Sequence, residues 1–364
     1  MRSLILSLFA LFAFALGGCG SGGKTGTAAK SAGGPDAPSA GGIVSVFIWS
    51  EYHDPEVVAE FEKQTGLKVK LSYFESNEQM LAKLQQPGSD KEYDIVVPSA
   101  HSVASMIKLD MLLPLDHAKL PNLKHIAPRF RDAAHDPGNK YAAPYFWGTT
   151  GILYRKDKLK DPPRSWSAIF KEPAGTFALL DEMRDLLGSA LVYQGKSSNS
   201  RNREELKAAA ELLIQAKHSE KFRFLSSGTE AKDKVLAGEI DMTVNWNGEG
   251  VRAMKESEQV DFFIPEEGSV LWVDSLAIPK HAPNPDGAHK LIDWLCEPKH
   301  AARQATALGY GSPVAAALEH LSKEDRENPR IYPPEELMRK LQIQEELGAD
   351  SQVWDELWTQ IKSR

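Results

Sequence analysis

The stretch Phe47-Ile48-Trp49-Ser50-Glu51-Tyr52-His53-Asp54-Pro55 joins two patterns that decide the fold. The apolar run that leads into it from Ile43 is typical of a buried strand. Asp54 and Pro55 are residue types preferred at the N-cap and the first position of a helix. Ligands of open α/β sheets bind at the carboxyl ends of strands. Two aromatic residues and a carboxylate between strand and helix therefore predict a ligand-binding loop.

The same alternation continues along the chain. We expect a helix over 54–64 that ends at Gly66, a strand over 67–73, a helix opened by the capping box Ser76-Asn77-Glu78-Gln79, and a strand over 94–99. This βαβαβ order predicts a mostly parallel sheet flanked by helices. A second set follows, with strands over 176–180 and 240–246, a helix over 202–217 and an apolar C-terminal helix. Two α/β lobes are expected.

Length and composition are ordinary for a soluble globular protein. The 364 residues allow two domains, and 42% are hydrophobic and 26% charged. The formal net charge is −7, so nothing indicates a nucleic-acid-binding protein.

The N-terminus predicts export. Arg2 precedes an apolar run that is too short to span a bilayer well, and Leu16-Gly17-Gly18-Cys19 resembles a bacterial lipobox. We expect a signal peptide over 1–18, a lipid on Cys19 and a flexible tether over 19–42; a plain signal peptide cleaved nearby is the alternative. The phosphate-loop pattern over 18–25 is set aside because cleavage would cut it. Cys296, left without a partner, is expected to be a small buried hydrophobe.

Three tryptophans share a feature. Each is followed within two or three residues by a carboxylate, in the pairs Trp49 with Glu51, Trp246 with Glu249, and Trp272 with Asp274. Trp272 and Asp274 lie two apart on an expected strand and so face the same side. Each pair could also be a core tryptophan beside a solvated acid. The acids in the run 181–185 could likewise have no function beyond a favourable interaction with the positive end of a helix dipole.

Aromatic faces with several acids suit two ligand classes. A polyammonium chain would place ammonium groups on carboxylates and methylenes or cations on tryptophan faces. A sugar would stack on aromatic rings and donate hydroxyl protons to the acids. Composition does not separate these two.

The whole body from residue 43 resembles the periplasmic spermidine/putrescine-binding proteins that serve polyamine ABC importers. The motifs that carry the resemblance are Trp49-Ser50-Glu51-Tyr52, Tyr93-Asp94-Ile95-Val96-Val97-Pro98-Ser99, Asp136-Pro137-Gly138-Asn139-Lys140-Tyr141, Pro144-Tyr145-Phe146-Trp147-Gly148-Thr149-Thr150-Gly151, Ile264-Pro265-Glu266-Glu267-Gly268, Leu271-Trp272-Val273-Asp274, Leu308-Gly309-Tyr310 and Ile331-Tyr332-Pro333-Pro334-Glu335-Glu336.

The resemblance implies an α/β, two-lobed periplasmic-binding-protein fold of type II with discontinuous lobes. Lobe 1 would comprise 43–148 and 275–320, and lobe 2 would comprise 149–274 and 321–364. The ligand would lie in the cleft between them, and the lobes would close over it.

The resemblance also implies the contact residues. The positions that match the family's ligand contacts, together with two departures from its pattern, are Trp49, Ser50, Glu51, Tyr52, Ser99, His101, Glu182, Asp185, Trp246, Glu249, Trp272, Asp274, Tyr310 and Gln344. Trp49 and Tyr52 would pack the methylene chain, Glu51 would help neutralise an ammonium, and Asp274 would engage an amine.

The two departures leave the preferred polyamine open. His101 stands where spermidine binders usually have an aromatic residue, and Glu249 stands where some have a small neutral one. Counting Glu51, Glu182, Asp185, Glu249 and Asp274 as available acids favours spermidine, with putrescine also bound. If His101 lies near the ligand, its protonation would weaken binding between about pH 8 and pH 5.5.

These observations predict the solute-binding component of an ABC importer, which binds spermidine, putrescine or both. It would be a monomer in the periplasm, anchored to a membrane through Cys19, with the importer's permease as partner and no cofactor, metal or catalytic residue. The alternatives are a same-fold binding protein for a sugar or another cation, a polyamine sensor lipoprotein, and an enzyme. No G-x-S-x-G or H-E-x-x-H motif supports the last of these.

Overall fold

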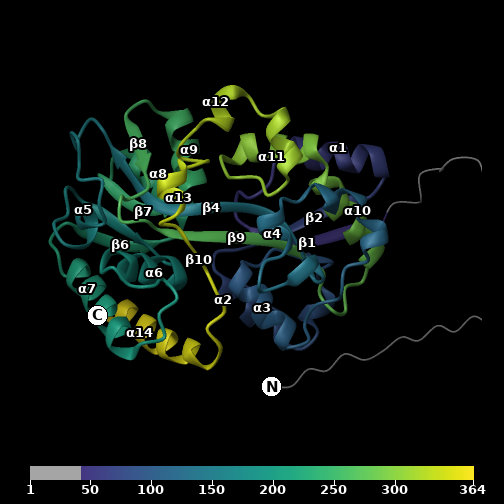
Figure 1. Cartoon of the computed structure of the whole chain (residues 1–364), viewed down its shortest axis with the longest axis horizontal. Coiled ribbons are helices and arrows are strands. Elements are labelled where there is room, and N and C mark those ends of the chain that lie inside the picture. Colours follow the sequence, from purple (N-terminus) through teal and green to yellow (C-terminus); the bar gives the residue numbers. More distant parts are fainter. Residues whose placement is uncertain (1–41) are drawn as a thin grey trace, which may run out of the picture. The chain divides into compact units, whose positions relative to one another are not determined.

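A computed structural model describes residues 42–364, and the expected signal peptide, Cys19 and almost all of the tether lie outside this range (Figure 1). The first set of elements is β1 (Ile43–Trp49), α1 (Pro55–Thr65), β2 (Lys68–Phe74), α2 (Asn77–Leu84), β3 (Ile95–Val96), α3 (Ala100–Lys108) and α4 (Pro128–Arg131). The second set is β4 (Ala142–Arg155), α5 (Ser167–Phe170), β5 (Phe177–Leu180), α6 (Met183–Tyr193), α7 (Arg203–Lys217), β6 (Phe222–Ser226), α8 (Gly228–Ala237), β7 (Met242–Trp246), α9 (Asn247–Glu256) and β8 (Val260–Phe263). The last set is β9 (Val270–Ala277), α10 (Pro285–Cys296), α11 (Pro298–Leu308), α12 (Lys323–Arg326), α13 (Glu335–Met338), β10 (Gln342–Ile343) and α14 (Ser351–Ser363).

The caps of the first helices follow the sequence signals. Asp54 accepts a hydrogen bond from the Glu56 backbone at 2.8 Å, which starts α1, and Gly66 ends it with a φ of 72° that favours glycine. Ser76 caps α2 by accepting from the Gln79 backbone at 3.2 Å. The second half of the expected capping box differs, because the Gln79 side chain accepts from the Glu75 backbone rather than from Ser76.

The strands form one mixed sheet in the order β2-β1-β3-β9-β4-β7-β5-β6, with β10 beside β9 and β8 beside β4. β1 is parallel to β2 and β3, and β5 is parallel to β6 and β7. The expectation of a mostly parallel sheet is wrong at the centre. There β9 runs antiparallel to β3 and β4, and β4 runs antiparallel to β7 and β8. The long strands β4 and β9 lie side by side through the middle of Figure 1.

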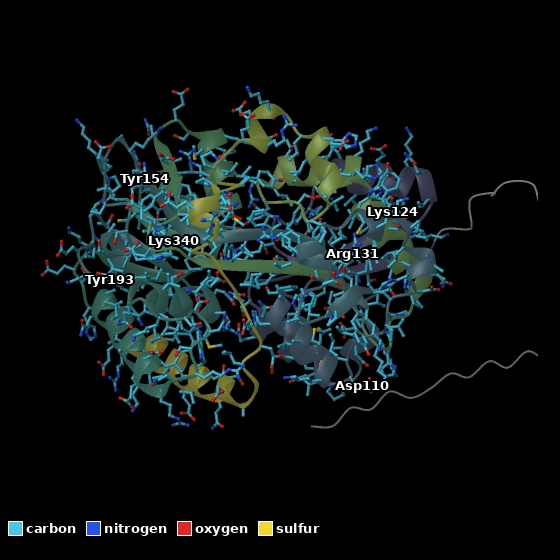
Figure 2. All side chains as sticks on the ribbon, in the orientation of Figure 1. Asp110, Lys124, Arg131, Tyr154, Tyr193 and Lys340 are labelled. Carbon is cyan, nitrogen blue, oxygen red and sulfur yellow. The ribbon has the colours of Figure 1, made fainter. Side chains whose placement is uncertain are left out.

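Separate apolar cores give the body its two lobes. One core gathers buried residues between 44 and 147 with residues between 271 and 321, on the side of α1 and α10. A second gathers residues between 152 and 263 with the C-terminal helix α14. β4 joins them, since Phe146 belongs to the first core and Ile152 to the second. The exposed side chains of Asp110 and Lys124 lie on the outer rim of the first lobe (Figure 2).

The expected burial of Cys296 is confirmed, since it is buried as a free thiol. Trp147, Trp166 and Trp354 are also core residues, with 4% exposure or less. In residues 42–364 no helix combines the length and the apolar character needed to cross a bilayer.

Candidate functional site

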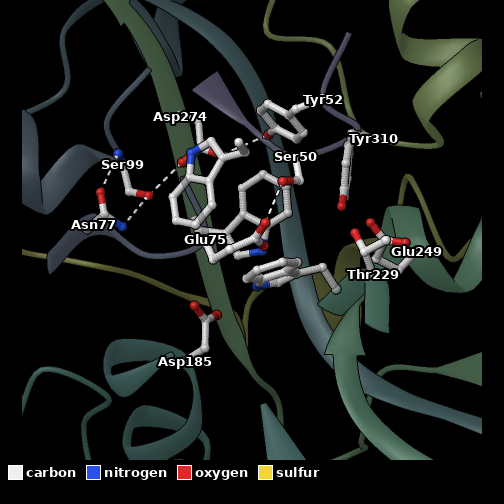
Figure 3. A pocket seen from close by; sticks show the side chains of 13 residues that line it. Ser50, Tyr52, Glu75, Asn77, Ser99, Asp185, Thr229, Glu249, Asp274 and Tyr310 are labelled. Carbon is white, nitrogen blue, oxygen red and sulfur yellow. Dashed lines mark hydrogen bonds between the residues drawn. The ribbon is translucent and has the colours of Figure 1, made fainter. Parts of the chain in front are cut away.

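A cavity lies where the strand ends of the two lobes meet (Figure 3). Trp49 closes β1, and Trp246 closes β7 directly before α9. Trp272 and Asp274 project from β9, which borders both lobes. The residues that line the cavity are Trp49, Ser50, Tyr52, Glu75, Asn77, Ser99, Asp185, Thr229, Trp246, Glu249, Trp272, Asp274 and Tyr310.

Aromatic rings form the walls of this cavity. The ring centroids of Trp49 and Trp246 lie 5.9 Å apart, so tryptophans of the two lobes meet edge to face. Tyr310 packs in the same manner against Trp272 at 5.0 Å and Tyr52 at 5.3 Å. The indole nitrogen of Trp272 is buried and has no hydrogen-bond partner. The walls therefore present apolar faces that suit methylene groups or cations.

Asp274 is a buried carboxyl held by neutral donors. Its two oxygens accept hydrogen bonds from the Tyr52 hydroxyl at 2.8 Å and from Ser99 Oγ at 2.6 Å. Asn77 orients Ser99 by donating to its Oγ at 3.0 Å and accepting from its backbone nitrogen at 3.1 Å. Burial raises the pKa of Asp274 to about 7, although the bonds from Ser99 and Tyr52 oppose this shift. A ligand cation would supply the missing positive charge.

A second pair of acids lies at the start of α6. Asp185 accepts from Thr150 Oγ1 and from Gln344 Nε2, the latter at 3.4 Å. Burial raises the pKa of Asp185 to about 6, against the effect of these bonds. Glu182 is only 2% exposed, and neither of its carboxyl oxygens has a hydrogen-bond partner. Burial, followed by Glu78 and Asp185, holds its pKa well above the ordinary value.

Glu249, another acid of the cavity lining, is paired with cations of its own lobe. Arg252 donates to its Oε1, and the ammonium of Lys232 lies 3.7 Å from its Oε2. Both cations also reach Glu51 of the other lobe, Lys232 at 3.3 Å and Arg252 at 3.8 Å. Lys232 also lies 3.5 Å from Asp233 and 4.0 Å from Glu256, two exposed acids, so the two bases at this end of the cavity are paired with four acids.

Most of the residues expected from the resemblance come together here. Those that line the cavity are Trp49, Ser50, Tyr52, Ser99, Asp185, Trp246, Glu249, Trp272, Asp274 and Tyr310. Those outside its lining are Glu51, His101, Glu182 and Gln344.

The four residues outside the lining have other neighbours. Glu51 is 52% exposed at its side chain and faces Lys232 and Arg252, so its carboxylate is already compensated. Gln344 bridges Asp185 to His101, whose Nδ1 lies 3.1 Å from Gln344 Oε1. His101 lines a different cavity together with Arg184. Burial, then Arg184, holds the pKa of His101 well below 6.5, which disfavours the expected protonation of His101 between pH 8 and pH 5.5.

Three lining residues were not predicted from the sequence. Glu75 directly follows β2 and accepts from Ser50 Oγ, so the strand-end rule that selected Trp49 would have found it. Asn77 was assigned only to a helix start. Thr229 lies in the first turn of α8 and carries no pattern that distinguishes it from a surface threonine.

Residues 42–364 contain no group of three or more His, Cys, Asp or Glu side chains arranged to hold a metal ion. The cavity instead offers acceptors and aromatic faces, which suit an organic cation.

Comparison with known proteins gives a consistent result. Residues 56–330 match the family model of the bacterial extracellular solute-binding protein. The chain is 35% identical to spermidine/putrescine-binding periplasmic protein 1 of Haemophilus influenzae, with 89% of this chain and 90% of that protein covered. It is 33% identical to the putrescine-binding periplasmic protein PotF of Escherichia coli, with 87% and 90% covered.

Solved structures agree. The spermidine/putrescine ABC transporter substrate-binding protein PotD of Streptococcus pneumoniae matches with a TM-score of 0.74 and 31% identity, covering 88% of this chain and 98% of that one. The TpPotD lipoprotein of Treponema pallidum matches with a TM-score of 0.77 and 29% identity, covering 89% and 100%.

Proposed function

This chain belongs to the bacterial extracellular solute-binding protein family, and we propose that it binds spermidine or putrescine and delivers it to the permease of an ABC importer. The observation that carries the proposal is the combination of aromatic walls with buried acids that form no salt bridge. Asp274 accepts hydrogen bonds only from neutral groups, and Glu182 accepts none. A polyamine supplies the charge that these acids need.

The energetics favour an organic cation. A charge-assisted hydrogen bond contributes roughly 1.5–3 kcal/mol, and a cation on a tryptophan face contributes about 0.5–2 kcal/mol. Trp49, Trp246 and Trp272 can enclose the methylene chain between two ammonium groups. One ammonium would lie at Asp274 and another toward Asp185 and Glu182.

A sugar is the poorer candidate for this cavity. Its hydroxyl groups would hydrogen-bond to Asp274 and Asp185 without neutralising them, so the cost of ionising buried acids would remain. The polyamine-binding relatives described above also support the cation.

We extend the proposal to the N-terminal segment. Cleavage after residue 18 and lipidation of Cys19 would anchor the protein to a membrane facing the periplasm, and residues 19–42 would tether the lobes. The protein would act as a monomer and without catalysis, since capture and release by lobe closure need no reaction. A sensor would instead signal through a membrane partner, and loss of polyamine uptake in a deletion strain would distinguish the importer component.

Isothermal titration calorimetry of the purified protein tests the proposal. Putrescine and spermidine should bind with one molecule per chain, while glucose, maltose and other neutral sugars should release no heat. Binding of a sugar together with no binding of any polyamine would overturn the assignment.

A further inference from the structure

The Glu249 end of the cavity differs in charge from the remainder. We define the Glu249 cluster as Glu51, Lys232, Glu249 and Arg252; the exposed acids Asp233 and Glu256 also pair with Lys232, at 3.5 and 4.0 Å. Among the other acids, Asp274 and Glu75 accept side-chain hydrogen bonds only from hydroxyl groups, and Arg184 is the nearby base of Glu182 and Asp185. The cavity acids that form no salt bridge therefore lie away from Glu249.

Lys232 is held in place as a charged residue. Its side chain is 6% exposed, and its ammonium lies 3.3 Å from Glu51 and 3.7 Å from Glu249. Burial disfavours the charged form, but Glu249 and Glu51 outweigh burial and raise the pKa of Lys232 above its ordinary value. The ammonium is charged throughout the neutral range.

Arg252 is equally constrained. It donates to Glu249 and to the Leu308 carbonyl, the latter at 3.1 Å, and its guanidinium lies 5.9 Å from the centre of the Tyr310 ring. Turning away from Glu249 would break these contacts and leave a buried acid uncompensated. The second oxygen of Glu249 accepts no hydrogen bond, and the Lys232 ammonium 3.7 Å away offsets its charge.

We infer, on the basis of the proposed polyamine binding, that Lys232 and Arg252 are specificity-determining residues that exclude a ligand ammonium from the Glu249 end and so select a diamine over a triamine. A diamine places its two ammonium groups at Asp274 and at the Asp185–Glu182 acids. The third ammonium of a triamine would approach Glu249 and meet two like charges beside it.

The same contacts cross between the lobes, because Glu51 follows β1 whereas Lys232 and Arg252 belong to α8 and α9. If they only held the lobes closed, removing either cation would weaken both ligands to the same extent. The ratio of the dissociation constants for putrescine and spermidine therefore distinguishes a role in ligand selection from a role in holding the lobes closed.

Calorimetric titrations with putrescine and spermidine on the wild type, Lys232→Met and Arg252→Met test the inference. The wild type should prefer putrescine, and each variant should shift the ratio toward spermidine by about tenfold, because a like-charge contact is removed while Glu249 remains. Adding Glu249→Gln to Arg252→Met should cancel the shift. Arg252→Lys, which keeps the charge, should retain the wild-type ratio.

Lys234→Met is the matched control. Lys234 lies on the same helix, is 32% exposed and pairs with Glu239 at 2.7 Å outside the cavity, so its removal should leave the ratio unchanged. If Lys232→Met fails to fold in a thermal melt, Arg252→Gln decides alone, since its side chain is nearer to solvent. An unchanged ratio in the folded charge-removing variants, or a wild type that prefers spermidine, would overturn the inference. A wild type that binds neither amine would instead refute the proposed function.

Discussion

Tyr52 and Asp274 are 222 residues apart in the chain, yet the Tyr52 hydroxyl donates to the Asp274 carboxylate at 2.8 Å inside the cavity. Tyr52 comes from the loop after β1, and Asp274 comes from the central strand β9. Burial also raises the pKa of Tyr52 well above 10, so the phenol keeps its proton and remains a donor. This bond orients the acid that we assign to a ligand ammonium.

Replacement of Asp274 by alanine should weaken polyamine binding by roughly 2–4 kcal/mol, the scale for removing one partner of a buried charge pair. Calorimetry measures the change. The control is Asp286→Ala, because Asp286 is 75% exposed and pairs with Lys119 at the surface. Equal effects of the two substitutions would remove Asp274 from the site.

Tyr52→Phe should weaken binding by about 0.5–1.5 kcal/mol, since it removes one hydrogen bond to Asp274 and keeps the ring against Tyr310. It should also raise the pKa of Asp274 further. Calorimetry at two pH values would detect both effects. Wild-type affinity at both values would show that the bond does not position the acid.

Binding should depend on pH through Asp274 and Asp185. Their pKa values in the free protein are raised to about 7 and about 6, and a bound ammonium favours the ionised forms. Below these values the ligand must displace a proton. Affinity should therefore be complete only well above about pH 7 and should fall as the pH decreases through about 7 and about 6, by up to about tenfold per unit for each protonated acid.

Two variants identify the group responsible for that profile. Asp274→Asn should remove the step near pH 7. His101→Tyr should leave the profile intact, because burial lowers the pKa of His101 well below 6.5 and so favours its neutral form. If the affinity of His101→Tyr did not depend on pH, the histidine would be the group that causes the pH dependence.

Gly148→Ala should disturb the aromatic wall. Gly148 pairs with Trp272 across β4 and β9, and an added Cβ would overlap the Trp272 indole and the Asn247 side chain. We expect a loss of about 1–3 kcal/mol in the free energy of unfolding and weaker binding. Chemical denaturation measures the first effect. Gly42→Ala, which meets only ordinary contacts, is the control and should change little.

Cys19→Ala tests the proposed anchor. Binding should be unchanged, while the protein should leave the membrane fraction or remain unprocessed, because the lipid-bearing thiol is absent. Fractionation and mass measurement of the product would show this. A processed variant that still sediments with membranes would contradict lipidation at Cys19.

Local patterns in the sequence were sufficient to predict many of the helices and strands of this protein. The apolar run of β1, the Asp54 cap, Pro55 and Gly66 act within one turn or strand, so their structure follows from neighbouring residues. The strand-end rule and the family motifs predicted one shared site for Trp49, Trp246, Trp272 and Asp274, because strand ends meet at one edge of a sheet. All four line the cavity.

Tertiary structure alone decided the electrostatics. Counting Glu51 and Glu249 as available acids favoured spermidine, but their partner Lys232 lies 181 residues from Glu51 and is brought to it only by the folded lobes. The pKa of His101 likewise depends on burial, which its neighbours in the chain do not specify. Residue types and spacing define strands, caps and candidate acids. The charge of each acid depends on desolvation and on partners that come from distant parts of the chain.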